Sequence, residues 1–158
     1  MRSSAGLDHG AAFLGAENDI FMPKDKIAPF SPDDAGMEAA IAEAKASIGK
    51  FIDAFCRPTA RQRSFLVKVV FDEGDQREHI WVADLNFSGN KPSGVIANEP
   101  RLPGLKFMQR VEFEPSYISD WMYVDDGYLV GGYTTRVIRD RMSPEARSQF
   151  DANIPYRF

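Results

Sequence analysis

Residues 117–133 read Y-I-S-D-W-M-Y-V-D-D-G-Y-L-V-G-G-Y and carry the clearest fold signal in the chain. Apolar and aromatic residues occupy both sides of the D-D-G sequence at 125–127, which is typical of a turn between two antiparallel strands. The glycine pair at 131–132 then ends the second strand, because glycine is disfavoured inside strands. We therefore predict a β-hairpin here, followed by an exit from the sheet.

Upstream of this hairpin, apolar residues recur with the period of two that indicates β-strands. We expect strands at 65–71, 76–87, 94–98 and 105–113, separated by turns and prolines. Strict alternation along the second of these strands places one set of side chains on a single face, namely His79, Trp81, Ala83, Leu85 and Phe87. Together with the hairpin, this predicts an antiparallel sheet of about five or six strands.

Helices are expected on both sides of this sheet region in the sequence. S-P-D-D at 31–34 predicts a helix start with Ser31 as the N-cap, and apolar residues then recur in steps of three and four as far as Phe55. Shorter helices are expected at 134–141 and after Ser143. The predicted fold is α+β, with a long N-terminal helix packed on a curved antiparallel sheet and short C-terminal helices.

The composition describes an ordinary globular chain. With 158 residues, 44% hydrophobic and 27% charged, it fits one domain. We expect a disordered tail at 1–16 and one domain at 17–158, on which the apolar residues 20–22 dock. A net charge of -4 gives no general attraction to nucleic acid or anionic lipid. The single cysteine excludes an internal disulfide, and no apolar run or signal pattern is visible, so we expect a cytoplasmic protein without a membrane span.

The candidate catalytic residues are His79, Ser119 and Asp120, and none lies in a recognised motif. Adjacent residues of a strand point to opposite faces, so Ser119 and Asp120 are expected on opposite sides of the sheet. Asp120 stands among apolar residues, where a carboxylate needs a partner, and Arg136 is the predicted partner.

No metal or cofactor is expected. The two histidines, His9 and His79, lack the paired spacing of metal ligands. The segment G-G-Y-T-T-R at 131–136 places glycines before a helix start, where anions bind, but it lacks the spacing of a nucleotide-binding loop. Cys56 lies beside Arg57, which favours a thiolate, yet its simpler interpretation is a small residue that closes the helix.

The favoured function is a non-enzymatic binding or protein-interaction module, whose partner is a protein or a small ligand of unknown identity. Tyrosine and tryptophan suit such surfaces, although they also fill cores. The predicted binding residues are Trp81, Asp120, Trp121, Tyr123, Tyr133 and Arg136. One alternative is a small hydrolase-like enzyme that uses His79 and Asp120. The other is RNA or single-stranded DNA binding through the C-terminal arginines, against which the acidic charge argues.

Four motifs resemble the bacterial YegJ-like family, which carries domain of unknown function 2314. They are F-M-P-K-D at 21–25, E-H-I-W-V at 78–82, I-A-N-E-P at 96–100 and I-S-D-W-M-Y-V-D-D-G-Y-L-V-G-G-Y-T-T-R at 118–136. The resemblance covers about 17–140 and leaves 141–158 as a C-terminal extension. It implies no reaction, cofactor or substrate. Some members look secreted or lipid-anchored, and the missing signal here departs from them.

Overall fold

The computed structural model describes residues 34–158. The predictions made for the tail at 1–16 and for the docking of residues 20–22 lie outside this range, as do residues 31–33 of the predicted helix start. Within it, the fold is α+β, as predicted, and four helices accompany a sheet of six antiparallel strands.

The first part of the described chain forms two helices, α1 (Ala35–Ala46) and α2 (Ile48–Cys56). Asp34 is the N-cap of α1 in place of the predicted Ser31, and its Oδ1 accepts a hydrogen bond from the Met37 amide at 3.0 Å. Ser47 separates the helices, and its hydroxyl donates to the Glu43 carbonyl at 2.7 Å, a bond that competes with regular helix geometry. The single long helix is therefore not confirmed.

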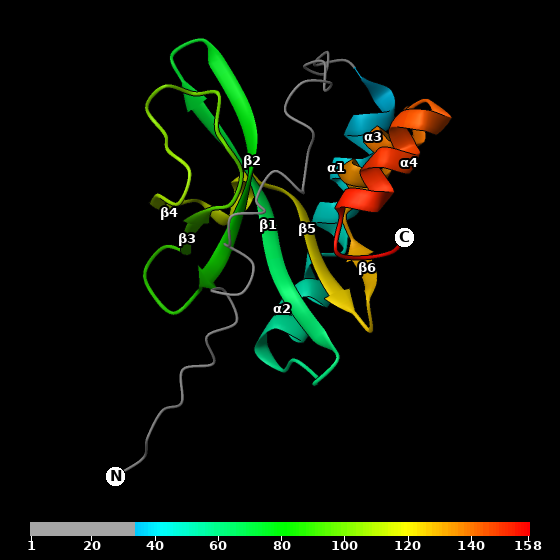
Figure 1. Cartoon of the computed structure of the whole chain (residues 1–158). Helices are drawn as coiled ribbons and strands as arrows, with labels where there is room; N and C mark the ends of the chain where they lie inside the picture. Colours follow the sequence, from blue (N-terminus) through cyan, green and yellow to red (C-terminus); the bar gives the residue numbers. More distant parts are fainter. Residues whose placement is uncertain (1–33) are drawn as a thin grey trace.

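The sheet has the strand order β4-β3-β2-β1-β5-β6 (Figure 1), and every pair of neighbours is antiparallel. The strands are β1 (Gln62–Glu73), β2 (Gln76–Asn86), β3 (Ser93–Ile96), β4 (Arg110–Glu112), β5 (Ile118–Asp125) and β6 (Tyr128–Gly131). The predicted hairpin is β5–β6, whose turn residues Asp126 and Gly127 have φ of 51° and 84°. Positive φ at both positions suits a tight two-residue hairpin turn.

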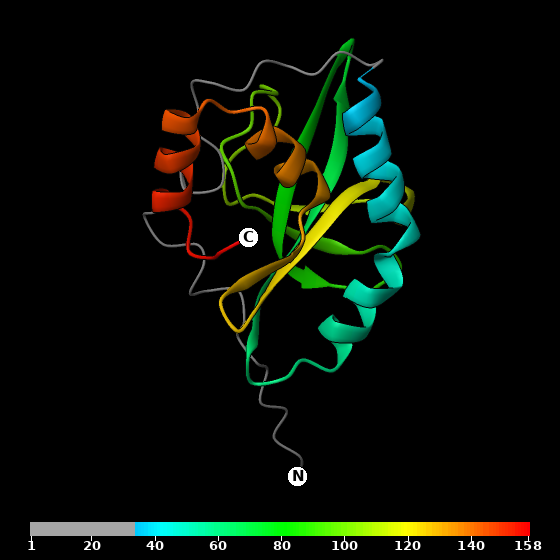
Figure 2. The same cartoon turned by 90° about the vertical axis from the view of Figure 1, so that its right-hand side faces the viewer.

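The sheet separates two layers of helices (Figure 2). On one face, α1 and α2 cover a core that includes Phe51, Val67 and Trp121. On the other face, α4 (Pro144–Asn153) and the C-terminal residues cover a core that includes Leu66 and Trp81. Between them, α3 (Tyr133–Asp140) follows β6 and contacts α1. The two short C-terminal helices are thus confirmed.

A bulge in β2 changes which side chains share a face. Asp84 has φ of 47°, and the pairing of β2 with β3 shifts between Ala83 and Asn86. Ala83 packs in the α4 core with Trp81, whereas Leu85 and Phe87 pack against the α1–α2 core. The prediction that these residues share one face is therefore wrong beyond Ala83, because the irregularity reverses the alternation.

A second bulge lies in β5, at the two candidate residues of the hairpin motif. β1 aligns Val69 with Ile118 and Lys68 with Asp120, which leaves Ser119 as an extra residue in β5. Ile118 consequently packs in the same core as Trp121. The predicted separation of Ser119 from Asp120 is wrong, because a bulge places two consecutive side chains on one side of a strand.

Candidate functional site

A cluster of polar residues lies on the face of the sheet that α4 covers. It consists of Lys68 from β1, His79 from β2, Ser119 and Asp120 from β5, and Thr134 from α3. Four of these residues are buried, with exposed fractions of 5% for Lys68, 1% for Ser119, 0% for Asp120 and 2% for Thr134. His79 stands at the rim, where its ring is exposed to solvent. The structure thus brings all three candidate catalytic residues into one neighbourhood.

The Asp120 carboxylate is held by the N-terminus of α3. Its Oδ1 accepts from the amides of Trp121 at 2.8 Å and Tyr133 at 3.1 Å, and its Oδ2 accepts from the Thr134 amide at 2.8 Å and the Thr134 hydroxyl at 2.5 Å. Gly132, with φ of 65°, lets the chain turn sharply from β6 into α3. The sequence at 131–136 suggests a helix N-terminus that could bind an anion. In the structure, this N-terminus of α3 binds the Asp120 carboxylate of the same chain.

Lys68 supplies the opposite charge of the cluster. Its Nζ donates to the Thr134 hydroxyl at 2.9 Å and lies 4.9 Å from the centre of the Trp81 ring. Burial lowers the pKa of Lys68 below its ordinary value, and the nearby Asp120 carboxylate opposes that shift. The Thr134 hydroxyl thus connects the ammonium to the carboxylate, since it accepts from one and donates to the other.

His79 is the member of the cluster that reaches solvent, and its side chain contacts the buried Ser119. The His79 Nδ1 lies 2.9 Å from the Ser119 Oγ, and that hydroxyl also lies 3.4 Å from the Lys68 carbonyl. Partial burial, together with the positive charges of Lys68 and Arg77, lowers the pKa of His79 to about 4. The ring is therefore neutral at pH 7, as a general base must be, but the serine oxygen beside it is buried.

Acidification is expected to destabilise the fold through His79. Its pKa falls from 6.5 to about 4 on folding, so between those values only the unfolded chain takes up the proton. This contribution is fully present above pH 6.5 and is lost as the pH falls towards 4. Because the ring is exposed, we expect a loss on the order of 1 kcal/mol. Urea unfolding from about pH 7 to pH 4 should show a shallower decline for His79→Gln than for wild type. Parallel declines would contradict this role of His79.

The predicted binding aromatics do not gather on one surface. Trp81 is buried in the α4 core, whereas Trp121 and Tyr123 stack in the α1–α2 core with ring centres 6.0 Å apart. Tyr133 is half-buried, and its hydroxyl lies within hydrogen-bond distance of the Ser47 hydroxyl, at 3.0 Å. No pocket can be lined by both tryptophans, because they lie on opposite faces of the sheet.

The prediction that Arg136 pairs with Asp120 is wrong. Its guanidinium donates to the Gly131 carbonyl at 3.0 Å and the Leu129 carbonyl at 2.9 Å, and it packs 5.6 Å from the centre of the Phe158 ring. The other C-terminal arginines also bond within the chain. Arg139 pairs with Asp151, Arg141 with Asp34, and Arg147 with the carbonyls of Arg139 and Asp140. These internal bonds weaken the argument for a nucleic-acid surface at this end of the chain.

Residues 34–158 match the model of a family described as an uncharacterized protein conserved in bacteria, DUF2314. The chain belongs to the DUF2314 family. The match contains all five residues of the polar cluster and continues to residue 158. It therefore includes the C-terminal segment that the sequence motifs leave outside the resemblance.

Two relatives illustrate the similarity. The uncharacterized protein YegJ of Escherichia coli K12 is 32% identical over 103 residues, which are 65% of this chain and 66% of the relative. A putative ankyrin repeat protein of Neisseria meningitidis serogroup B is 37% identical over 92 residues, 55% of this chain and 36% of that protein. The match thus spans just under two thirds of the length of YegJ and about one third of the length of the ankyrin repeat protein. No solved structure matches it.

Sequence reasoning missed two members of the cluster, Lys68 and Thr134. Lys68 interrupts the apolar run F-L-V-K-V-V-F at 65–71, which is the same signal that singled out Asp120. Nowhere in residues 34–158 do three His, Cys, Asp or Glu residues gather as ligands for a metal ion, and no helix there is long and apolar enough to cross a membrane. A shallow polar hollow of about 470 Å³ lies at the β2–β3 turn, where Asn86, Lys91 and Glu112 contribute to its lining.

Proposed function

We propose that this DUF2314 chain is a non-enzymatic domain that binds a protein partner. The observation that carries the proposal is the internal hydrogen bonding of the buried polar groups. Asp120 accepts four hydrogen bonds, and Lys68 is held against Thr134. Across the described part of the chain, no buried side-chain nitrogen or oxygen lacks a hydrogen-bond partner. A cluster so fully bonded stabilises a fold and leaves little capacity for a substrate.

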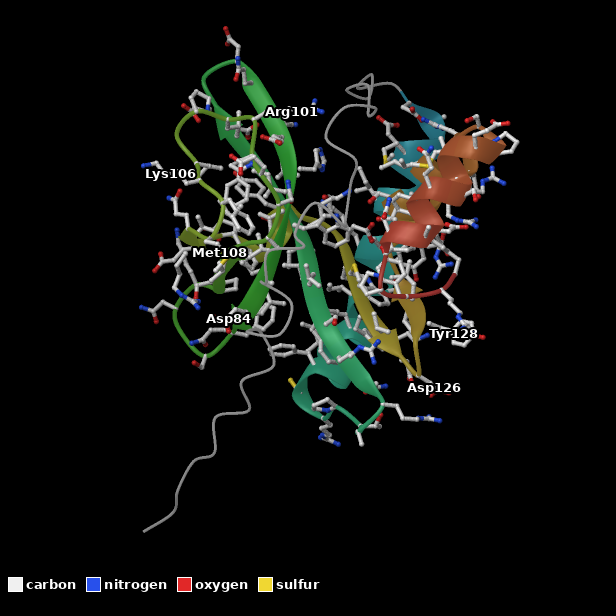
Figure 3. The ribbon with its side chains drawn as sticks, viewed as in Figure 1. Asp84, Arg101, Lys106, Met108, Asp126 and Tyr128 are labelled. Carbon is white, nitrogen blue, oxygen red and sulfur yellow. The ribbon has the colours of Figure 1, made fainter. Side chains whose placement is uncertain are left out.

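The surface offers contact positions of the kind that binding domains use. The large hydrophobic side chains exposed in residues 34–158 are Met108 at 46%, Tyr117 at 51% and Tyr128 at 49%. Figure 3 shows Met108 on the side of β3 and β4 and Tyr128 at the β5–β6 end of the molecule. Aromatic residues and methionine are enriched at protein interfaces. One relative is named a putative ankyrin repeat protein, and ankyrin repeats form extended binding surfaces.

Capture of binding proteins from a native lysate tests this proposal. One variant changes a buried residue of the polar cluster, and three others change exposed residues. Wild type and Ser119→Ala should retain the same protein, which is then purified and titrated. At least one of Met108→Ala, Tyr117→Ala and Tyr128→Ala should weaken binding about tenfold or more, as expected for an exposed anchor residue. Recovery of the chain alone under all conditions would contradict the proposal.

A hydrolase-like enzyme is the second candidate, and one observation favours it. The His79 Nδ1 lies within hydrogen-bond distance of the Ser119 Oγ, as in a nucleophile and its base. Such a serine should react with a fluorophosphonate probe in wild type and not in Ser119→Ala. Labelling with this dependence on Ser119 would replace the interaction proposal by the enzyme, whereas unlabelled wild type removes the enzyme candidate.

A further inference from the structure

The two edge strands of the sheet, β6 and β4, differ in whether another segment of the chain pairs with their outer side. At the β6 edge, the C-terminal segment adds a bridge between Tyr128 and Arg157. The Leu129 amide donates to the Arg157 carbonyl at 2.7 Å, and the Arg157 amide donates to the Gly127 carbonyl at 2.9 Å. At the other edge, β4 pairs with β3 on its inner side, and no other strand in residues 34–158 pairs with it. An edge of this kind presents backbone groups to which another strand can bind.

The hydrogen bonds between β3 and β4 define which backbone groups of β4 point outward. The Phe113 amide donates to the Pro92 carbonyl at 3.0 Å, and the Ile96 amide donates to the Gln109 carbonyl at 2.9 Å. Backbone groups alternate between the two sides of an antiparallel strand, so Val111 also faces β3. The intervening residues, Arg110 and Glu112, therefore direct their amide and carbonyl groups away from the sheet.

The side chains of this strand are self-complementary. Arg110 and Glu112 are exposed and carry opposite charges, and they flank Val111, which packs against the α1–α2 core. A second β4 laid antiparallel on the first, with a two-fold axis at Val111, places each Arg110 opposite the Glu112 of the other copy. The four outward amides and carbonyls of each strand then face their counterparts, as in the hydrogen-bonded pairs of an antiparallel ladder.

We propose that a second copy of this chain docks on β4 and extends the sheet across the dimer. An isologous contact of this kind needs one patch that complements itself, and the order Arg110-Val111-Glu112 has that property. In the single chain the exposed Arg110 guanidinium is bonded to the Asp84 carboxylate of β2, on the inner side of β3, so it turns outward from Asp84 to pair with the Glu112 of the other copy. Lys106 and Met108 lie on the same side of the molecule as β3 and β4 in Figure 3. This inference is independent of the proposed function, because self-association requires no other partner.

The contact has few residues, so the dimer is expected to be weak. Three residues of β4 cover far less than the roughly 1,600 Å² of a standard interface. Dimer formation should therefore be visible by sedimentation velocity only at chain concentrations of about 0.1–1 mM.

Charge reversal provides the test. Arg110→Glu and Glu112→Arg, each alone, should weaken dimerisation about tenfold or more, because each brings like charges together. An equimolar mixture of the two variants should dimerise again, since every cross-strand pair is then of opposite charge, and so should the double variant. Lys106→Glu, a reversal on the same surface outside β4, should leave the dimer unchanged.

Three outcomes would overturn the proposal. They are a wild-type chain that stays monomeric at about 1 mM, single reversals that dimerise as wild type does, and a mixture that remains monomeric. Recovery in the mixture also shows that both variants are folded. A lysate protein that binds wild type and Arg110→Glu alike would support the proposed function whether or not the dimer forms, so failure of the dimer and failure of the proposed function are distinguishable.

Discussion

Replacing Asp120 with alanine is expected to lower the free energy of unfolding by about 3–5 kcal/mol, the usual cost of leaving a buried charge without its partner. Lys68 would remain in the interior beside Thr134 with no carboxylate near it. The amides of Tyr133 and Thr134 would also lose their acceptor at the start of α3. Urea unfolding followed by circular dichroism measures this loss.

Asp125→Ala is the matched control, because Asp125 is an acid of the same strand at its half-buried end. Its carboxylate accepts from the Gln62 amide group at 3.1 Å and has no buried counter-charge. We expect a loss of less than about 1 kcal/mol there. If Asp120→Ala does not fold, Asp120→Asn supplies the measurement, since its amide keeps one acceptor for α3. Equal losses at Asp120 and Asp125 would contradict the account of the cluster.

Replacing Gly131 with alanine is the second large effect, with an expected loss of about 3 kcal/mol or more. Gly131 has φ of 74°, which disfavours any side chain. An added Cβ would also lie 2.4 Å from the Trp121 carbonyl oxygen and 2.5 Å from the Trp121 ring. The Trp121 ring cannot easily move away from this Cβ, because its Nε1 donates to the Ala44 carbonyl of α1 at 3.0 Å. Either Trp121 or the β6–α3 connection must move.

Gly127→Ala separates the two causes of this loss, the backbone strain of a positive φ and the steric clash with Trp121. Gly127 has φ of 84°, but a Cβ added there meets no atom within 4 Å. Its substitution should therefore cost only the conformational strain, about 1 kcal/mol. Thermal unfolding of both variants is the measurement. A Gly131 variant no less stable than the Gly127 variant would show that the contact with Trp121 does not constrain the fold.

Much of the architecture was predictable because local signals agree with it. The D-D-G sequence at 125–127 predicts the β5–β6 turn, and period-two alternation predicts β1 and β2. Ser143 predicts the start of α4, where its hydroxyl accepts from the Ala146 amide at 3.1 Å. The break at Ser47 could not be predicted in the same way, because one polar residue on a helix is ordinary until its contacts are known.

The bulges explain most of what sequence reasoning placed wrongly. A single extra residue in a strand leaves composition and average periodicity almost unchanged, yet it moves every following side chain to the other face. At Asp84 it relocates Leu85 and Phe87, and at Ser119 it places that residue and Asp120 on one side. The predicted strand at 105–113 is also shorter than expected, since Met108, with φ of 69°, keeps the chain irregular up to β4.

For the site, the sequence identified the right residue and the wrong partner. A carboxylate among apolar residues indicated that Asp120 needs donors, which the structure bears out. Arg136 was a reasonable candidate because side-chain charges are visible in a sequence. Three of the four donors lie at the start of α3, namely the amides of Tyr133 and Thr134 and the Thr134 hydroxyl, and these become available only when folding brings α3 back against β5. The segment 118–136 therefore contains both the acid and the helix start that binds it.

The most direct test of the account is a double-mutant cycle between Lys68 and Asp120. The central claim is that the polar cluster stabilises the fold as one unit. Lys68→Met and Asp120→Asn should each lower the free energy of unfolding by several kcal/mol, because each leaves a buried polar group uncompensated. The double variant should lose at least about 1 kcal/mol less than the sum of the two losses. Losses that add to within about 0.5 kcal/mol would contradict the claim.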